Sequence, residues 1–199
     1  MTIERISPEN KIIVLLELNT KPMGRYKLSE ITGIPEGVLR SFLKRLTESN
    51  FCNKYGKKGH DLSEKGRKLV KNIRKLIVDF KHFDAKDLTV SLVDFACQIR
   101  GIADKIDISK TIEVRDSALI AGSTGATTIV FEAGELQGPA IDFHLVSRWP
   151  VVTGDIYHNF DLKDGDVIIV ATGRDVIHAR RGAFAAALTL IGPFGLGSI

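Results

Sequence analysis

The chain has 199 residues, an apolar fraction of 44% and a formal net charge of +4, which excludes a disordered chain and suits one large domain or two small ones. Its longest apolar run, Ala183–Ile191, is shorter than the ~18 residues that a membrane helix needs, and the N-terminus has no apolar signal core. We therefore expect a cytoplasmic protein with no membrane partner.

The charge is distributed unevenly along the chain. Residues 1–82 carry 18 Lys and Arg against 9 Asp and Glu, whereas residues 83–199 carry 10 against 15. Such asymmetry is typical of a protein in which one domain binds a polyanion, although a solvated basic face on an ordinary helical domain has the same composition. The charges and the composition predict two domains, 1–82 and 83–199.

Three helices are predicted first. Ser7-Pro8-Glu9 is typical of a helix start, and Lys21–Gly24 contains helix breakers. A second helix is expected at residues 27–32, followed by Gly33, and a third from Pro35 to about Asn50. The third helix has one inward apolar stripe and a basic outer face, and such a helix after a tight glycine turn is typical of a helix-turn-helix.

A two-stranded ribbon and a long helix are predicted next. Residues 51–55 and 60–62 are typical of short strands, and the turn at 56–59 carries two lysines, which predicts a wing. The helix that follows is expected to place an apolar stripe on one face: Leu69, Val70, Ile73, Leu76, Ile77 and Phe80.

The segment KGHDLSEKGRKL, residues 58–69, resembles the end of the wing in bacterial and archaeal winged-helix regulators. In those families a turn glycine, a strand ending in Leu-Ser or Leu-Thr and a Glu-Lys-Gly helix start follow the recognition helix. The resemblance covers residues 8–80, and the whole chain is similar to archaeal predicted transcriptional regulators with a C-terminal domain of uncharacterised function. It implies a sequence-specific, DNA-binding transcriptional regulator.

The outward side of the third helix and the lysine-tipped ribbon form the predicted DNA-binding surface. Arg40 is the best candidate for a bidentate guanine contact, and Gly37 leaves room for close approach near the helix start. Lysines of the ribbon are expected to meet phosphates of double-stranded DNA. The complete predicted set is Lys27, Ser29, Gly37, Arg40, Ser41, Lys44, Arg45, Lys54, Lys57 and Lys58.

Residues 83–199 are predicted to fold as a small α/β or α+β domain, a sheet flanked by helices. Residues 88–97 favour a strand, with a helix as the alternative. Further strands are expected at 126–131, 139–145 and 167–171. Helices are expected at 111–122, with Ile112, Val114, Leu119 and Ile120 inward, and at 175–190.

The C-terminal half contains none of the catalytic or metal-binding motifs that we considered, and we predict no enzyme, no cofactor and no metal. The segment Gly122–Thr128 invites a phosphate-loop interpretation, but it runs from a helix into a strand, so a structural turn is favoured. Arg174, Arg180 and Arg181 are candidate contacts for a small anionic effector, with helix capping and ion pairing as the alternative.

Two pairs of residues have the chemistry of metal ligands, Asp142 with His144 and Asp155 with His158, but the sequence gives no reason for the pairs to converge. An enzyme in this half, with the winged helix as an autoregulatory attachment, is the alternative function. Its candidates, Asp116, Asp142, His144 and His178, are scattered along the chain.

The architecture also suggests how the two halves cooperate. A regulator that reads a nearly palindromic site places two modules one helical turn apart, so we expect a homodimer. The C-terminal domain would dimerise, sense a small molecule, or both. A scaffold protein that uses the module only for protein contacts is the remaining alternative.

Overall fold

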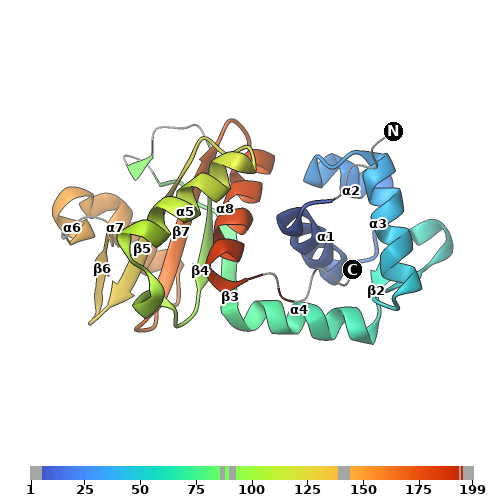
Figure 1. Ribbon diagram of the computed structural model, residues 1–199, viewed down its shortest axis with the longest axis horizontal. Coiled ribbons are helices and arrows are strands. Elements are labelled where there is room, and N and C mark those ends of the chain that lie inside the picture. Colours follow the sequence, from blue (N-terminus) through green and yellow to red (C-terminus); the bar gives the residue numbers. More distant parts are fainter. Residues whose placement is uncertain (1–5, 86–87, 90–92, 139–143, 193, 195–199) are drawn as a thin grey trace. The chain divides into compact units, whose positions relative to one another are not determined.

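The computed structural model describes residues 6–85, 88–89, 93–138, 144–192 and 194 (Figure 1). The chain divides into two compact units between Arg74 and Lys75. Its elements in chain order are α1 (Pro8–Thr20), α2 (Arg25–Thr32), α3 (Glu36–Glu48), β1 (Cys52–Lys54), η1 (Gly56–Lys58), β2 (His60–Leu62), α4 (Glu64–Leu76), β3 (Ile77–His82), β4 (Val93–Ile99), η3 (Ala103–Lys105), α5 (Ile108–Ile120), β5 (Gly125–Glu132), β6 (Glu135–Gln137), α6 (Leu145–Arg148), α7 (Pro150–Asn159), β7 (Asp166–Gly173) and α8 (Val176–Ile191). This is the mixed α+β class that the sequence predicts.

The first unit has the element order of a winged helix-turn-helix, and its local signals act as predicted. Pro8 opens α1 directly after Ser7, and Gly33 ends α2 with a left-handed backbone (φ 66°) that suits glycine. The helix α3 buries its apolar stripe and exposes its basic side. The buried residues of α3 are Leu39, Phe42, Leu43 and Leu46.

The ribbon is a short antiparallel pair in which Cys52 lies opposite Leu62. A single turn of 3-10 helix, η1, joins the two strands at its tip. The Ser63 hydroxyl donates to the Asn50 carbonyl at 2.6 Å and so links the two ends of the ribbon, and Arg67 of α4 donates to both carboxylate oxygens of Asp61 at 2.8 and 2.9 Å.

The predicted extension of the long helix to Phe80 is wrong. The helix α4 ends at Leu76, and the next residue begins β3, which pairs with β4 in the sheet of the second unit. Ile77 and Phe80 fit a helical spacing, but in the structure they are extended and pair with β4. The Phe80 ring also contacts the Phe184 ring, with 5.3 Å between the centroids, and both interactions stabilise the strand. For this reason the units divide earlier than residue 82, where the sequence places the boundary.

The second unit contains a five-stranded sheet in the order β3-β4-β7-β5-β6, and every neighbouring pair is antiparallel. The strand β7 lies in the middle and is buried along its whole length. Helices α5 and α8 pack against one face of the sheet (Figure 1). On the other face, Val152 and Ile156 of α7 pack with Ile168 and Val170 of β7.

Three predictions for this unit need correction. The helix at 111–122 exists as α5, but Ile112, Leu119 and Ile120 are exposed, and its buried residues are Val114 and Ala118. The strand β4 begins at Val93 rather than at residue 88. On the side away from β7, β5 pairs with β6, Glu135–Gln137. The predicted strand at 139–145 falls mostly on residues outside the described part, and its last residue, Leu145, begins α6.

Among the described residues, none of the helices combines the length and the apolarity that crossing a bilayer requires. The two cysteines are free and buried, one in each unit. Burial, with Asp61 nearby, raises the pKa of the Cys52 thiol to about 12, and burial also raises the pKa of Cys97. Neither thiol is therefore a nucleophile at neutral pH.

Candidate nucleic-acid interface

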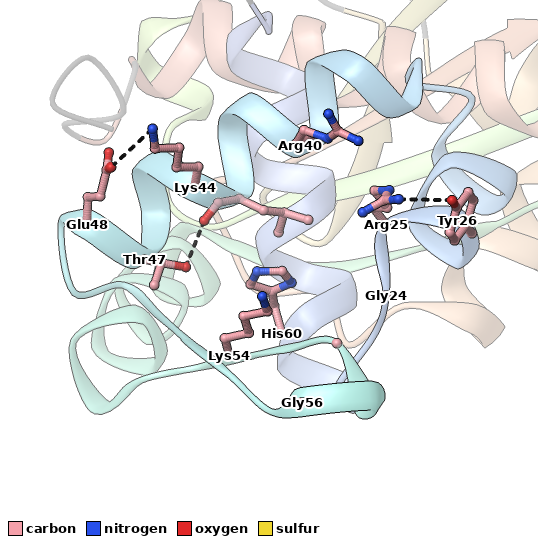
Figure 2. A pocket seen from close by; sticks show the side chains of 12 residues that line it. Gly24, Arg25, Tyr26, Arg40, Lys44, Thr47, Glu48, Lys54, Gly56 and His60 are labelled. Atoms are coloured by element: carbon pink, nitrogen blue, oxygen red, sulfur yellow. Dashed lines mark hydrogen bonds and ion pairs between the residues drawn. The ribbon is translucent and has the colours of Figure 1, made fainter.

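The helix α3, the ribbon and the start of α2 surround a cavity of about 450 Å³ in the first unit (Figure 2). Arg40 and Lys44 come from α3, Lys54 and His60 from the ribbon, and Arg25 from the first residue of α2. The complete lining is Gly24, Arg25, Tyr26, Arg40, Leu43, Lys44, Thr47, Glu48, Lys54, Gly56, Gly59 and His60. The cavity therefore joins the two parts of the predicted DNA-binding surface.

A backbone bridge links the ribbon to the segment that precedes α2. The Met23 amide donates to the His60 carbonyl at 2.9 Å, and the His60 amide donates to the Met23 carbonyl at 2.8 Å, so residue 23 adds a third short strand segment to the ribbon. A Cβ built on Gly59 would lie 2.2 Å from the Met23 carbonyl oxygen. Glycine at position 59 is therefore required for this close approach.

Four basic side chains, Arg25, Arg40, Lys44 and Lys54, line the cavity. Two of them have acidic neighbours: Arg25 Nε lies 3.6 Å from Glu36 Oε2, and Lys44 Nζ lies 3.7 Å from Glu48 Oε1. The side chains of Lys44 and Glu48 are 75% and 62% exposed, so this ion pair is weak and readily exchanged. No ion pair within the described part of the chain engages Arg40 or Lys54, which leaves both charges available to a ligand.

His60 is the titratable group of the cavity. Burial, followed by the nearby charge of Lys54, lowers the pKa of His60 below its ordinary value. Its Nδ1 atom is buried and has no hydrogen-bond partner among the described residues. The imidazole is therefore uncharged at neutral pH, and an anion placed in the cavity would favour its protonated form.

Tyr26 adds an exposed aromatic ring beside these charges. Its side chain is 64% exposed, and its hydroxyl accepts a hydrogen bond of 2.9 Å from Arg25. The guanidinium carbon of Arg25 lies 4.6 Å from the ring centroid, a cation–π geometry. The Tyr26 hydrogen bond is the largest cause of a raised Arg25 pKa, so this arginine stays charged.

The structure brings Arg40, Lys44 and Lys54 of the predicted set together in the cavity. Arg45 stacks on Phe42 (5.8 Å from the guanidinium carbon to the ring centroid), and the Ser41 hydroxyl donates to the Gly37 carbonyl at 3.1 Å. Gly37 is exposed, and a Cβ built on it meets nothing within 4 Å.

Other predicted residues lie outside the cavity lining. Lys27 pairs with Glu30 at 2.8 Å, and the Ser29 hydroxyl donates to the Ile34 carbonyl at 2.7 Å, so both have partners within the helical unit. Lys58 is exposed on η1, where Lys57 also lies. The sequence interpretation missed Arg25, Tyr26 and His60. Arg25 and Tyr26 directly follow the helix-breaking segment Lys21–Gly24, and His60 is the histidine of the predicted wing, so these two features were the available signals.

The candidate residues of the second unit are dispersed. Arg174 Nη2 lies 2.8 Å from His178 Nε2, and His178 Nδ1 lies 2.7 Å from Asp175 Oδ1, a cluster at the start of α8. Arg180 and Arg181 are half-buried and have interactions within the chain. The Ser123 hydroxyl of the Gly122–Thr128 segment donates to the Thr172 carbonyl at 2.8 Å, as in a structural turn between a helix and a strand.

The predicted metal-ligand types are also separated. His144 pairs with Glu135 at 2.6 Å on the surface, Asp116 is exposed on α5, and Asp142 falls outside the described residues. Asp155 and His158 lie on α7. In the part of the chain that the structure describes, no three His, Cys, Asp or Glu side chains gather as a metal ion would require.

Comparisons with known proteins agree with the division into two units. A family model described as the PH0730-like N-terminal domain matches residues 9–68, and comparison with curated proteins gave no match. The structure is similar to that of the hypothetical protein PH0730 from Pyrococcus horikoshii OT3, with a TM-score of 0.77 and 23% identity over 98% of this chain and 100% of that chain, which shows a shared fold. Because a second family model matches residues 90–190, about half of the sequence, the chain belongs to the family described as a domain of unknown function, DUF4443.

Proposed function

We propose that this chain is a sequence-specific regulator of transcription that binds double-stranded DNA as a dimer, rather than an enzyme. One observation carries the proposal: the exposed side of α3 and the ribbon flank a single cavity lined by Arg25, Arg40, Lys44 and Lys54. A helix with a basic outer face enters the major groove of a duplex, and a ribbon beside it meets the adjacent backbone. The cavity between the helix and the ribbon would then hold the DNA phosphates that lie between the major-groove contact and the backbone contact.

The charge of the unit supports an electrostatic contribution to binding. Residues 1–74 carry 16 Lys and Arg against 8 Asp and Glu, whereas residues 75–192 carry 12 against 16. Positive charge is therefore concentrated in the unit that contains the cavity. Each phosphate that a lysine or arginine neutralises releases condensed counterions, so the affinity is expected to fall steeply with salt.

The side chains divide into two roles. Arg40 presents a planar guanidinium from the exposed side of α3 and has no acidic partner among the described residues, which suits a bidentate contact to the two acceptors of a guanine. Lys54 presents a single charge from the ribbon and suits a phosphate. Lys44 would give up its weak ion pair with Glu48 and bind a second phosphate. Arg25 and Tyr26, which are joined by a hydrogen bond, line the same cavity.

The second unit completes the regulator by holding two copies together and by sensing a small anionic molecule. Binding of such an effector would change the spacing of two recognition helices through its different affinity for two arrangements. Arg174, Arg180 and Arg181 are the cationic side chains proposed for it. Mass spectrometry of small molecules released from the intact purified chain tests this part, and finding no ligand would leave the dimeric role alone.

The DNA-binding proposal is tested by selecting duplexes from a random library with the full-length chain. Fluorescence anisotropy then measures affinity for a selected duplex and for a scrambled one over a range of salt concentrations. Replacing Arg40 and Lys44 by alanine is expected to remove the preference for the selected duplex and to lower the slope of log affinity against log salt by about one. The matched control is Lys68→Ala with Lys71→Ala, which removes two exposed charges from α4, outside the cavity.

The control variant separates site contacts from net charge. If the selected duplex loses affinity only with the cavity variant, α3 is the recognition helix. If the cavity variant and the α4 control lose equal affinity, the effect is due to overall charge. If the cavity variant binds the selected duplex as the wild type does, α3 is not the recognition helix. Circular dichroism of both variants checks that the helices remain folded.

A further inference from the structure

The outward face of α5 is apolar, although the helix is well packed on its other side. Val114 and Ala118 are buried, and α5 contacts α8 and β5 (Figure 1). On the opposite side, Ile108 is 58% exposed, Ile112 53% and Leu119 37%. Positions 108, 112, 115 and 119 are separated by four, three and four residues, so they form one stripe along the helix.

This stripe is more than a scatter of apolar side chains. Single exposed aliphatic residues are common on protein surfaces, but several of them aligned on one face of a helix mark an interaction site. Ile120, 89% exposed, extends the apolar surface at the end of the same helix. No other part of the described chain covers these side chains.

Two charges of opposite sign lie in the middle of the stripe. Arg115 and Asp116 are both exposed, and no ion pair or hydrogen bond of the described residues engages either side chain. A neighbouring pair, Lys110 and Glu113, is by contrast already satisfied within the helix at 2.7 Å. Water solvates both charges in the free chain, so a partner that covers the stripe has to replace this water by offering an acid opposite the arginine and a base opposite the aspartate.

A second copy of the same helix meets this requirement. In a two-fold contact, residue i of one copy meets residue j of the other, and j meets i. When two α5 helices lie antiparallel with Arg115 opposite Asp116 of the second copy, Ile112 lies opposite Leu119 of the second copy. The same register then pairs both charges twice and places apolar residues against apolar residues on each side of them.

We infer that two copies of this chain associate through α5 in this antiparallel register. The inference rests on the proposed function, because it names the surface that holds together a dimer reading two half-sites. A contact made by one helix from each copy lies at the small end of interfaces, below about 1,200 Å² in total. Association is therefore expected in the micromolar range and to be strengthened when both copies bind one duplex.

The two-fold symmetry allows a decisive charge-swap experiment on the full-length chain. Arg115→Asp places two acids opposite two acids in the homodimer, and Asp116→Arg places two bases opposite two bases. Each single variant is expected to raise the dimer dissociation constant at least about tenfold. An equimolar mixture of the two single variants restores both opposite-charge contacts, and so does the double variant, so both samples are expected to dimerise again.

Sedimentation velocity over about 1 to 100 µM chain measures these equilibria. The control Lys163→Asp makes the same charge change as Arg115→Asp at an exposed residue outside α5 and is expected to stay dimeric. Recovery of the dimer on mixing shows that both single variants are folded. A wild-type chain that is monomeric throughout this range, or single variants that dimerise as well as the wild type, would overturn the inference.

DNA binding provides the readout that separates this inference from the proposed function. The Arg115→Asp variant is expected to bind a duplex with one half-site as tightly as the wild type, and a palindromic duplex at least about tenfold more weakly. If the charge swaps behave as described but no duplex is bound selectively, only the regulator proposal fails. If selective DNA binding persists while the swaps leave the dimer unchanged, only the α5 interface fails.

Discussion

Arg40 and His60 contribute to the same cavity in different ways. The guanidinium of Arg40 contributes a positive charge, whereas the imidazole of His60 contributes one only when it takes up a proton. In the free chain, burial and Lys54 keep the pKa of His60 below its ordinary value of about 6.5, so the ring is uncharged at pH 7.5. A phosphate in the cavity would reverse this preference.

We therefore predict that DNA binding takes up a proton at His60. Affinity for the selected duplex should increase about three- to tenfold as the pH falls from 7.5 to about 5.5, because phosphate raises the pKa of the imidazole in the complex. His60→Gln should remove this increase, whereas the control His158→Gln, an exposed position on α7, should keep it. Anisotropy titrations at constant ionic strength measure the effect.

The free chain should respond to pH in the opposite direction. Because the pKa of His60 is lowered in the folded state, the unfolded chain binds the proton at a higher pH. The free energy of unfolding without DNA should therefore decrease as the pH falls through about 6.5.

A DNA affinity that does not change between pH 7.5 and about 5.5, or that has the same pH dependence in His60→Gln, would exclude the histidine as the group coupled to DNA binding.

At the level of elements, Gly37 and Gly154 both have free space around them in the chain, but only one of them is expected to contact DNA. A Cβ built on Gly37 of α3 or on Gly154 of α7 meets nothing within 4 Å, and both positions are exposed. The fold itself therefore does not require glycine at either position. In the proposed complex, only Gly37 lies where the nucleic acid approaches α3.

Alanine at either position should stabilise the free chain by up to about 1 kcal/mol, because alanine loses less backbone entropy in a helix than glycine does. Gly37→Ala should nevertheless weaken binding of the selected duplex about tenfold, while Gly154→Ala should leave it unchanged. Urea denaturation and anisotropy on the same samples measure both quantities. Unchanged DNA affinity in Gly37→Ala would mean that DNA does not approach this turn of α3 closely.

The elements of the first unit were predictable because each one is marked locally. Pro8 opens α1, Gly33 ends α2, and the glycines of the ribbon mark its turn. The cavity was only half predictable. Arg40, Lys44 and Lys54 follow from the outward faces of their elements, but His60 reaches the cavity through its backbone bridge to Met23, a contact between distant residues that no local pattern specifies.

The second unit was harder to predict because long-range pairing decides its structure. Ile77 and Phe80 satisfy helical spacing as well as strand alternation, and the choice depends on β4, which lies later in the chain. The sequence pattern predicts that the apolar face of α5 lies in the interior, because apolar helix faces usually do, whereas Ile112 and Leu119 are exposed. An exposed apolar face on a surface helix is the exception that indicates association.

At the level of the whole molecule, the two units have separate cores and are expected to have separate stabilities. The first unit is built from contacts among α1 to α4 and the ribbon, and the second from a sheet with helices on both faces. A ligand that binds one folded unit stabilises that unit by mass action. The proposed DNA ligand contacts only the first.

Scanning calorimetry should therefore show two unfolding transitions, of which the selected duplex shifts one. At a duplex concentration about 100 times the dissociation constant, the shifted transition gains about 2.7 kcal/mol. The scrambled duplex at elevated salt is the control and should shift neither. A single transition that moves as a whole would show instead that the units unfold together.

The position of β7 in the middle of its sheet has a consequence for synthesis on the ribosome. Both of its neighbours, β4 and β5, are translated earlier, and Val93 finds its partner only when Gly173 has been made. The elements from α1 to β2 and most of α4 are made by residue 74, so they can fold before β7 is available to pair with β4 and β5. A nascent chain thus exposes unpaired strand edges late in translation, and this interval is where chaperones would be needed most.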